Sequence, residues 1–191
     1  MKKTPAQGRS QATVEAVVTA TAQLLAERGY AALTTNHIAE RAGVSIGSIY
    51  QYFPGKEAIV AQVTERTVDA ILEDFGRGLL GHAIGPQRIA EVLYDTIDRR
   101  AGLLRALTHE VPFLRDLPAV VSMRGRLLAL AGRIYADQMG DRGFSHPEVV
   151  AFQLTTMMQA AVLESILAPL PGMTRRQAID TLAEIIARLS A

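Results

Sequence analysis

Cysteine and tryptophan are absent from the 191-residue sequence, and aromatic residues make up only 5% of it. Without cysteine the chain has no disulfide, no thiol nucleophile and no cysteine-ligated zinc. The shortage of aromatic rings disfavours an aromatic cage around a cationic ligand. The lack of cysteine also agrees with a cytoplasmic location. The apolar part of the N-terminus is broken by polar residues, so we expect no signal peptide.

Long apolar runs are scarce as well. The longest stretch without a charged residue, Val149 to Leu163, contains glutamines and threonines, so we expect no membrane span. The composition is otherwise that of a globular protein, with 49% hydrophobic and 20% charged residues, which excludes a disordered chain. The net charge of +1 leaves the partner open, but every lysine falls within the first 56 residues, which makes the N-terminal end mildly basic.

Apolar residues recur at the helical period through nearly every segment, and no segment alternates as a β-strand does. Gly29 ends the first helix, and Gly85-Pro86 begins a later one. Two capping boxes, Ser145-x-x-Glu148 and Thr174-x-x-Gln177, predict further helix starts. The sequence therefore predicts an all-α fold. A change of composition at residues 76–86 indicates the end of a helix that begins near Lys56. We take residues 1–66, approximately, as a small head and residues 67–191 as a larger body.

A helix-turn-helix is predicted within residues 41–60, RAGVSIGSIYQYFPGKEAIV. Gly43 supplies the positive φ of a tight turn, and Ala39 is small where a second helix crosses its backbone. Ser45 can cap that helix, which we expect over residues 46–53 with Ile49 and Phe53 facing the core. A plain αα-hairpin satisfies the same spacing, so the pattern alone leaves both structures open.

The stretch from residue 24 to residue 60, LLAERGYAALTTNHIAERAGVSIGSIYQYFPGKEAIV, resembles the N-terminal signature of the TetR-type transcriptional repressors. The resemblance covers only the first third of the chain. It implies a three-helix DNA-binding head on an all-α homodimer whose C-terminal body binds a ligand. It also implies a repressor that leaves a palindromic operator when a small-molecule effector binds, although the sequence leaves open whether the effector releases or promotes DNA binding. No metal or other cofactor is expected.

The candidate DNA contacts surround the predicted second helix. Gln51 is the best candidate for an adenine edge and Ile46 for a thymine methyl group, although Gln51 is also compatible with a solvated surface position. Tyr50 resembles the phosphate-contacting tyrosine of the family. Tyr52 is assigned to the core by the general motif and to the DNA backbone by the family. The full predicted set is Thr35, Ser45, Ile46, Gly47, Ser48, Tyr50, Gln51, Tyr52 and Lys56.

Three features near this helix concern phosphates. Lys56 begins the next helix, where a cation opposes the helix dipole, so a phosphate partner is the simplest account. Thr35 begins the preceding helix, and its hydroxyl can hold a phosphate or cap the helix. Lys2, Lys3 and Arg9 form either a basic arm that adds nonspecific affinity or a solvated tail.

The body offers a pocket and an interface. We expect a largely apolar effector pocket, for which an ordinary core is the alternative. Its candidate liners are Leu103, Leu107, His109, Phe113, Met123, Phe152, Met157 and Met158.

Residues 147–168 are apolar nearly all round, so this helix must be buried on more than one side. With the last helix it forms the expected dimer interface, against the alternative of a monomer with a well-buried helix. The candidate interface residues are Ala161, Glu164, Ala178, Leu182, Ile185, Ile186 and Leu189.

Other chemistry finds little support in the sequence. The run GRGLLG at residues 76–81 matches a dinucleotide fingerprint, but it follows a helical segment instead of a strand. The pair His109-Glu110 has no second histidine at zinc-binding spacing. An enzyme is the alternative function, and it requires an acid-base pair in a pocket that sequence spacing does not reveal.

Overall fold

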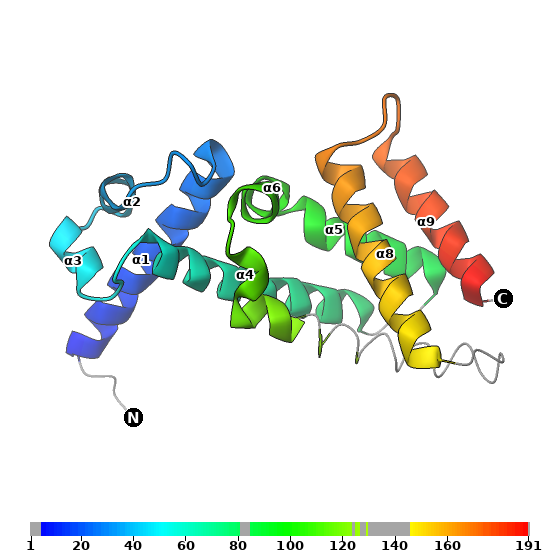
Figure 1. The fold of residues 1–191 in the computed structure, drawn as a ribbon, viewed down its shortest axis with the longest axis horizontal. Helices are drawn as coiled ribbons and strands as arrows, with labels where there is room; N and C mark the ends of the chain where they lie inside the picture. The colour runs from blue at the N-terminus through cyan, green and yellow to red at the C-terminus, as the bar shows by residue number, and fades with distance from the viewer. Residues whose placement is uncertain (1–4, 81–84, 124, 127–128, 130–145, 191) are drawn as a thin grey trace. The chain divides into compact units, whose positions relative to one another are not determined.

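The computed structural model describes residues 5–80, 85–123, 125–126, 129 and 146–190 (Figure 1). All regular structure in these ranges is helical, which confirms the all-α prediction. Residues 118–123 are helical as well. The named elements are α1 (Pro5–Arg28), α2 (Thr35–Ala42), α3 (Ile46–Tyr50), α4 (Lys56–Leu79), α5 (Pro86–Asp98), α6 (Ala101–Glu110), the 3-10 turn η1 (Leu114–Asp116), α8 (Pro147–Leu167) and α9 (Arg175–Ser190).

The chain divides into two compact units. The N-terminal unit consists of the residues up to Val68 together with Gly102–Val120, and the C-terminal unit consists of Asp69–Ala101 and the residues from Val121 onward. Helix α4 passes from the first unit into the second. Helix α6 follows α4 and α5 in sequence yet returns to the N-terminal unit, a feature that the sequence pattern does not indicate.

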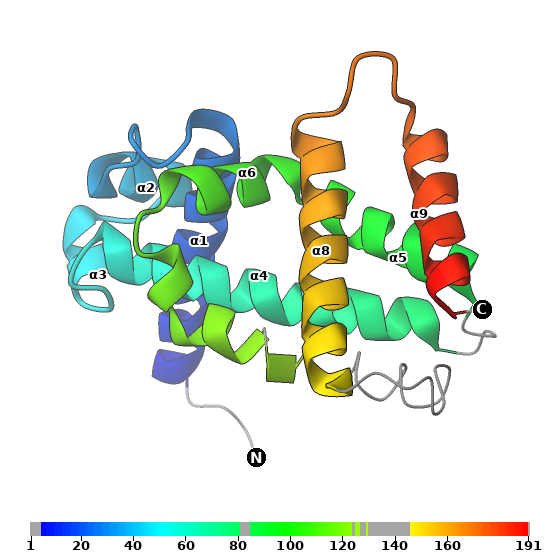
Figure 2. The same ribbon diagram turned by 45° about the vertical axis from the view of Figure 1, so that its right-hand side comes forward.

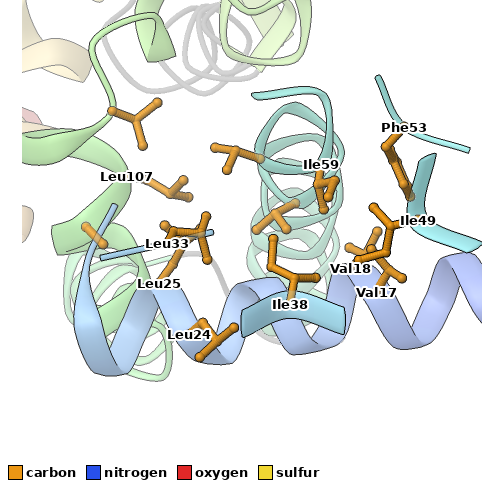
Figure 3. Close-up of a cluster of buried hydrophobic side chains, with 14 of the residues drawn as sticks. Val17, Val18, Leu24, Leu25, Leu33, Ile38, Ile49, Phe53, Ile59 and Leu107 are labelled. Atoms are coloured by element: carbon orange, nitrogen blue, oxygen red, sulfur yellow. The ribbon is translucent and has the colours of Figure 1, made fainter. Parts of the chain in front are cut away.

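One apolar core holds the N-terminal unit together (Figure 3). Ile38 of α2 and Ile49 of α3 are fully buried against α1, and Leu107 of α6 belongs to the same core. Burying side chains of this size stabilises the fold by about 1.5–3 kcal/mol each. Helices α2 and α3 are therefore fixed on α1 by packing, and α6 completes the core.

In the C-terminal unit, α5 packs along α9, and α8 lies beside α9 (Figures 1 and 2). Thr174 begins α9 with the predicted capping box, because its backbone N–H donates to Gln177 Oε1 at 2.9 Å and the Gln177 N–H donates to Thr174 Oγ1 at 3.2 Å. Helix α5 begins at Pro86 as predicted. Helix α8 instead has His146 at its N-cap, without a side-chain capping bond, and Ser145 lies outside the described residues.

One glycine of the GRGLLG run, Gly78, is explained by packing. A Cβ on Gly78 would lie 2.6 Å from Val92 Cγ1, so only glycine lets α4 and α5 approach this closely. Arg88 of α5 also donates from Nε to the Gly78 carbonyl at 2.9 Å. The run forms the C-terminal end of α4 and a helix contact, and Gly81 lies outside the described residues.

Helix α8 corrects one expectation from the sequence. The segment Glu148–Leu167 is long and apolar enough to cross a membrane by length and composition, although we expected no such segment. A helix that a soluble protein buries in its core or at an interface passes the same test, since apolar residues cover it nearly all round. Length and composition therefore do not separate these two uses of α8.

Candidate nucleic-acid interface

The turn between α2 and α3 has the predicted geometry. Gly43 ends α2 in the left-handed conformation at φ 66°, and its N–H donates to the Glu40 carbonyl at 3.2 Å. A Cβ on Gly43 would meet nothing within 4 Å, so the backbone angle alone favours glycine here. Ser45 caps α3 as predicted, because its Oγ accepts from the Ser48 N–H at 3.0 Å.

Helix α3 turns one face inward and the other toward solvent. Ile49 and Phe53 are 0% and 7% exposed, which confirms that they face the core. The helix ends at Tyr50, three residues earlier than predicted, but the Phe53 N–H still donates to the Ile49 carbonyl at 2.9 Å. That bond continues the helical turn and keeps Phe53 on the buried side. On the outer face Ile46 is 39% and Tyr50 55% exposed, and Gly47 and Gln51 are exposed too.

Most hydroxyl groups on this outer face already have partners. The Ser45 and Ser48 Oγ atoms lie 2.8 Å apart, and the Tyr50 hydroxyl lies 3.3 Å from Thr35 Oγ1. The structure records no side-chain hydrogen bond for Gln51 within the described chain. Among the polar side chains of residues 46–51, the Gln51 amide is thus the group left to bind a ligand from solvent.

Tyr52 contradicts the core position that the general motif assigns to it, whereas the DNA-backbone contact that the family implies stays a prediction. Its side chain is 39% exposed, so it is not a core residue, and its hydroxyl donates to Ser10 Oγ of α1 at 3.1 Å. Ser10 also lines an open depression, together with Gln11, Val14, Glu15 and Arg66. Sequence reasoning did not single out Ser10, because nothing in the local pattern of α1 relates it to a tyrosine 42 residues away.

Thr35 is the first residue of α2, as predicted, but it does not cap the helix. The cap is Thr34, whose Oγ1 accepts from the His37 N–H at 3.2 Å. Thr34 has the extended backbone of an N-cap, whereas Thr35 is already helical. His37 also lies on the surface, with Nδ1 3.1 Å from the Ala32 carbonyl oxygen.

Lys56 has internal partners that correct the argument for a phosphate at this position. Its Nζ donates to the Leu33 carbonyl at 3.1 Å and lies 4.3 Å from the centre of the Tyr30 ring. These contacts explain a cation at the start of α4 without an external anion. The Tyr30 hydroxyl donates to Glu57 Oε1 at 3.3 Å, and burial, together with the Glu57 charge, raises the pKa of Tyr30.

The predicted pocket liners fall in both units. Leu103, Leu107, His109 and Phe113 belong to the N-terminal unit, where Leu107 is 2% exposed and Leu103 and Phe113 pack on the same core. Leu107 is therefore a core residue of the N-terminal unit, and His109 is exposed. In the C-terminal unit, Met123 and Met158 are half-buried, whereas Phe152 and Met157 are 41% and 65% exposed.

The predicted interface residues also separate into two groups. Three candidate interface residues of α9 are already buried within the unit, where α9 packs along α5: Ala178, Leu182 and Ile186. Ala161, Glu164 and Ile185 are exposed, and Ile185 is 48% exposed. The Leu189 side chain lies outside the described residues.

A sequence model described as "Bacterial regulatory proteins, tetR family" matches residues 17–63, which extend from the middle of α1 through the turn into α4. These residues form a TetR-family DNA-binding segment. The chain is 25% identical over 182 residues to the HTH-type transcriptional regulator EthR of Mycolicibacterium smegmatis, which covers 90% of this chain and 83% of EthR. It is 38% identical over 87 residues to the HTH-type transcriptional repressor KstR2 of Rhodococcus jostii, which covers 46% of this chain but only 36% of KstR2.

Solved structures share this fold over most of the chain. A putative TetR-family transcriptional regulator from Rhodococcus sp. superposes with a TM-score of 0.70 at 18% identity, over 95% of this chain and 100% of the other. The relatives are transcriptional regulators rather than enzymes. The turn between α2 and α3 accordingly matches the DNA-binding helix-turn-helix of TetR-family transcriptional regulators.

Proposed function

We propose that the protein is a repressor that binds a near-palindromic operator as a homodimer and leaves it when a small apolar effector binds. The observation that carries the proposal is the outer face of α3, where Gln51 is exposed without a described side-chain partner. A glutamine amide can bind adenine in a bidentate pattern only if it is free: its NH2 group donates to N7, and its Oε1 accepts from the N6 amino group. Ile46, 39% exposed on the same helix, can contact a thymine methyl group.

The remaining residues of the predicted set suit contacts to the DNA backbone. The Thr35 and Tyr50 hydroxyls lie together at 3.3 Å, and paired hydroxyls of this kind can hold one phosphate oxygen. Ser45 and Ser48 hold the start of α3, and Gly47 carries no side chain that would keep the backbone away from the duplex. Tyr52 and Lys56 contribute backbone contacts in addition to their contacts inside the protein.

Base reading is tested by comparing two glutamines. An operator is first selected from random duplex DNA, and the affinities of wild-type protein, Gln51→Ala and Gln23→Ala are then measured for every single-base variant of one half-site. Gln51→Ala removes discrimination at one position per half-site, worth about 1–3 kcal/mol. Gln23 is an exposed glutamine of α1, so its replacement leaves the profile unchanged. Equal weakening on all variants by Gln51→Ala contradicts the assignment.

The dimer is proposed to form through α8. Among the α8 side chains that the structure describes, Thr155 and Val162 are buried, whereas Val149, Phe152 and Met157 are 41–65% exposed. A soluble monomer rarely exposes several large apolar side chains along one helix, so we infer that a second copy covers them. The dimer then presents two α3 helices to successive major grooves about 34 Å apart, and the operator is correspondingly two-fold symmetric.

The effector proposal rests on the apolar composition of the C-terminal unit. Half-buried Met123 and Met158 can adapt to a bound apolar molecule. An effector that favours the conformation unable to bind DNA lowers operator affinity by the factor by which operator lowers effector affinity. Titrating a ligand found by thermal-shift screening into the free dimer and into the operator complex tests this reciprocity. Equal affinities in the two titrations would make the protein a constitutive repressor.

We place the soluble protein in the cytoplasm, where its operator lies.

A further inference from the structure

The end of α6 meets the end of α1 through one carboxylate. The Tyr30 N–H donates to Glu110 Oε2 at 2.7 Å, although the two residues are 80 positions apart. Gly29, just before Tyr30, has φ +75°, and a Cβ there would lie 2.2 Å from the same oxygen atom. The glycine thus serves two needs at once, since it permits the left-handed turn and leaves room for the carboxylate.

Tyr30 connects this contact to the DNA-binding motif. Its carbonyl accepts from the Leu33 N–H at 3.2 Å, in the turn that leads directly to the Thr34 cap of α2. Its ring supports Lys56 Nζ at 4.3 Å and packs edge-on against Phe113, with the ring centres 6.0 Å apart. Its hydroxyl donates to Glu57. One residue therefore contacts α6, the segment after α6, the turn that precedes α2 and the start of α4.

The hydrogen bond to the Tyr30 N–H is the electrostatic interaction that favours Glu110 at the end of α6. A carboxylate in the last turn of a helix faces the negative end of the helix dipole, as Glu110 does in α6. The free N–H beyond the end of α1 compensates for this, because a hydrogen bond to a charged acceptor is among the stronger ones. Losing the acceptor leaves the half-buried N–H of Tyr30 without its partner.

We propose that Glu110 is a positioning residue for operator recognition: by holding the Tyr30 N–H it fixes the turn from which α2 and α3 are placed. The inference rests on the proposed DNA-binding function. Sequence-specific binding depends on the exact placement of α3, whereas nonspecific binding depends mainly on charge. Loosening the turn therefore reduces the affinity for operator more than the affinity for unrelated DNA.

Two conservative variants separate the effect of the length of the Glu110 side chain from the effect of its charge. Glu110→Asp keeps the charge but is one methylene too short to reach the Tyr30 N–H, and Glu110→Gln keeps the reach and an acceptor oxygen but loses the charge. We expect Glu110→Asp to lower operator affinity about tenfold, as for an unpaired buried donor, and to change nonspecific affinity less than about twofold. Glu110→Gln stays within about threefold of wild type. Arg105→Ala, at an exposed α6 position with no recorded side-chain bond in the described chain, is the matched control.

The Tyr30 amide gives a readout that loss of stability does not imitate. In the folded full-length dimer, its proton resonance moves upfield and its hydrogen exchange accelerates in Glu110→Asp but not in Arg105→Ala. Gly29→Ala, whose Cβ displaces the carboxylate, lowers operator affinity as Glu110→Asp does, and the two changes combined cost less than the sum of their separate effects.

Each possible failure points to a different conclusion. If wild-type protein selects no operator, the proposed function fails. If wild type binds operator and Glu110→Asp binds it equally well, the positioning role fails while the function stands. If Glu110→Gln loses as much affinity as Glu110→Asp, charge instead of reach matters, and the proposed mechanism is overturned. If Glu110→Asp does not fold, the hydrogen-exchange rate of the Tyr30 amide is compared between Glu110→Gln and wild type. Equal rates support the proposal, and a faster rate in Glu110→Gln contradicts it.

Discussion

The Tyr52 hydroxyl donates to Ser10 Oγ at 3.1 Å and so joins the segment after α3 to the first turns of α1. Tyr52→Phe removes this donor together with any contact of the hydroxyl to a DNA phosphate. Ser10→Ala removes only the internal acceptor. We expect Tyr52→Phe to weaken all duplexes alike by about 0.5–1.5 kcal/mol, the range of one hydrogen bond, and Ser10→Ala to stay close to wild type. Equal losses in the two variants, measured by fluorescence anisotropy, would restrict Tyr52 to its contact with α1.

Lys56 can be assigned to the protein interior or to DNA by salt titration. Lys56→Met keeps most of the stem but removes the charge from the Leu33 carbonyl and the Tyr30 ring, so it lowers the free energy of unfolding by about 0.5–1.5 kcal/mol. If Lys56 also contacts a phosphate, the slope of log affinity against log salt falls by about one. A lower melting temperature with an unchanged salt slope would show that Lys56 acts only within the protein.

Met157 tests the α8 interface. It is 65% exposed, and Val121 in the same unit, at 60%, provides a matched control on another helix. Met157→Glu should weaken the dimer at least about tenfold, because an interface would have to bury an unpaired carboxylate. Val121→Glu should leave the dimer intact. Analytical ultracentrifugation across a concentration series measures both, and a monomeric wild type at micromolar concentration would contradict the proposed dimer.

Two glycines of α4 should respond in opposite directions to alanine. In Gly78→Ala the new Cβ meets Val92 Cγ1 at 2.6 Å and Cγ2 at 2.9 Å, so overpacking lowers the free energy of unfolding by about 1–3 kcal/mol. In Gly76→Ala it meets nothing within 4 Å, and better helix propensity raises that free energy by about 0.5–1 kcal/mol. Urea unfolding measures both values. Adding Val92→Ala should reduce the cost of Gly78→Ala, and an undiminished cost would mean that Val92 is not its cause.

Asp74 should make stability depend on acidity. The hydrogen bond from Arg100, at 2.6 Å, and the charges of Arg100, Arg99 and Arg77 lower the pKa of Asp74, whose side chain is only 11% exposed. Because the folded pKa lies below the unfolded value of about 3.9, its stabilising contribution is complete above that value and is lost as pH falls through the folded pKa.

Urea unfolding at a series of pH values can isolate this contribution. Asp74→Asn should be less stable than wild type at pH 7, and the difference should shrink as the solution is acidified. Asp69→Asn, which removes an exposed pair with Arg126 at 3.4 Å, should cost little at any pH. A difference between wild type and Asp74→Asn that does not change with pH would contradict the role of the Asp74 charge.

The local features of the DNA-binding motif follow from the sequence alone. The positive φ of Gly43, the Ser45 cap and the inward positions of Ile49 and Phe53 depend on residues only a few positions apart, and each is present in the structure. The all-α class follows in the same way, from periodicity within each segment. Such signals are readable because the backbone angles and the helical period act over single turns.

The partners of these local elements depend on contacts between distant segments, and only the tertiary structure reveals them. Glu110 meets Tyr30 across 80 positions, Leu107 enters the core of the N-terminal unit, and α5 packs along the apolar side of α9 that was expected at a dimer interface. An apolar stripe on a helix indicates that the stripe must be buried. It does not indicate which other element buries it, because the hydrophobic effect is nondirectional. Close packing between elements decides which element covers the stripe. The close approach of Val92 to Gly78 is one such fit, and no local sequence pattern predicts it.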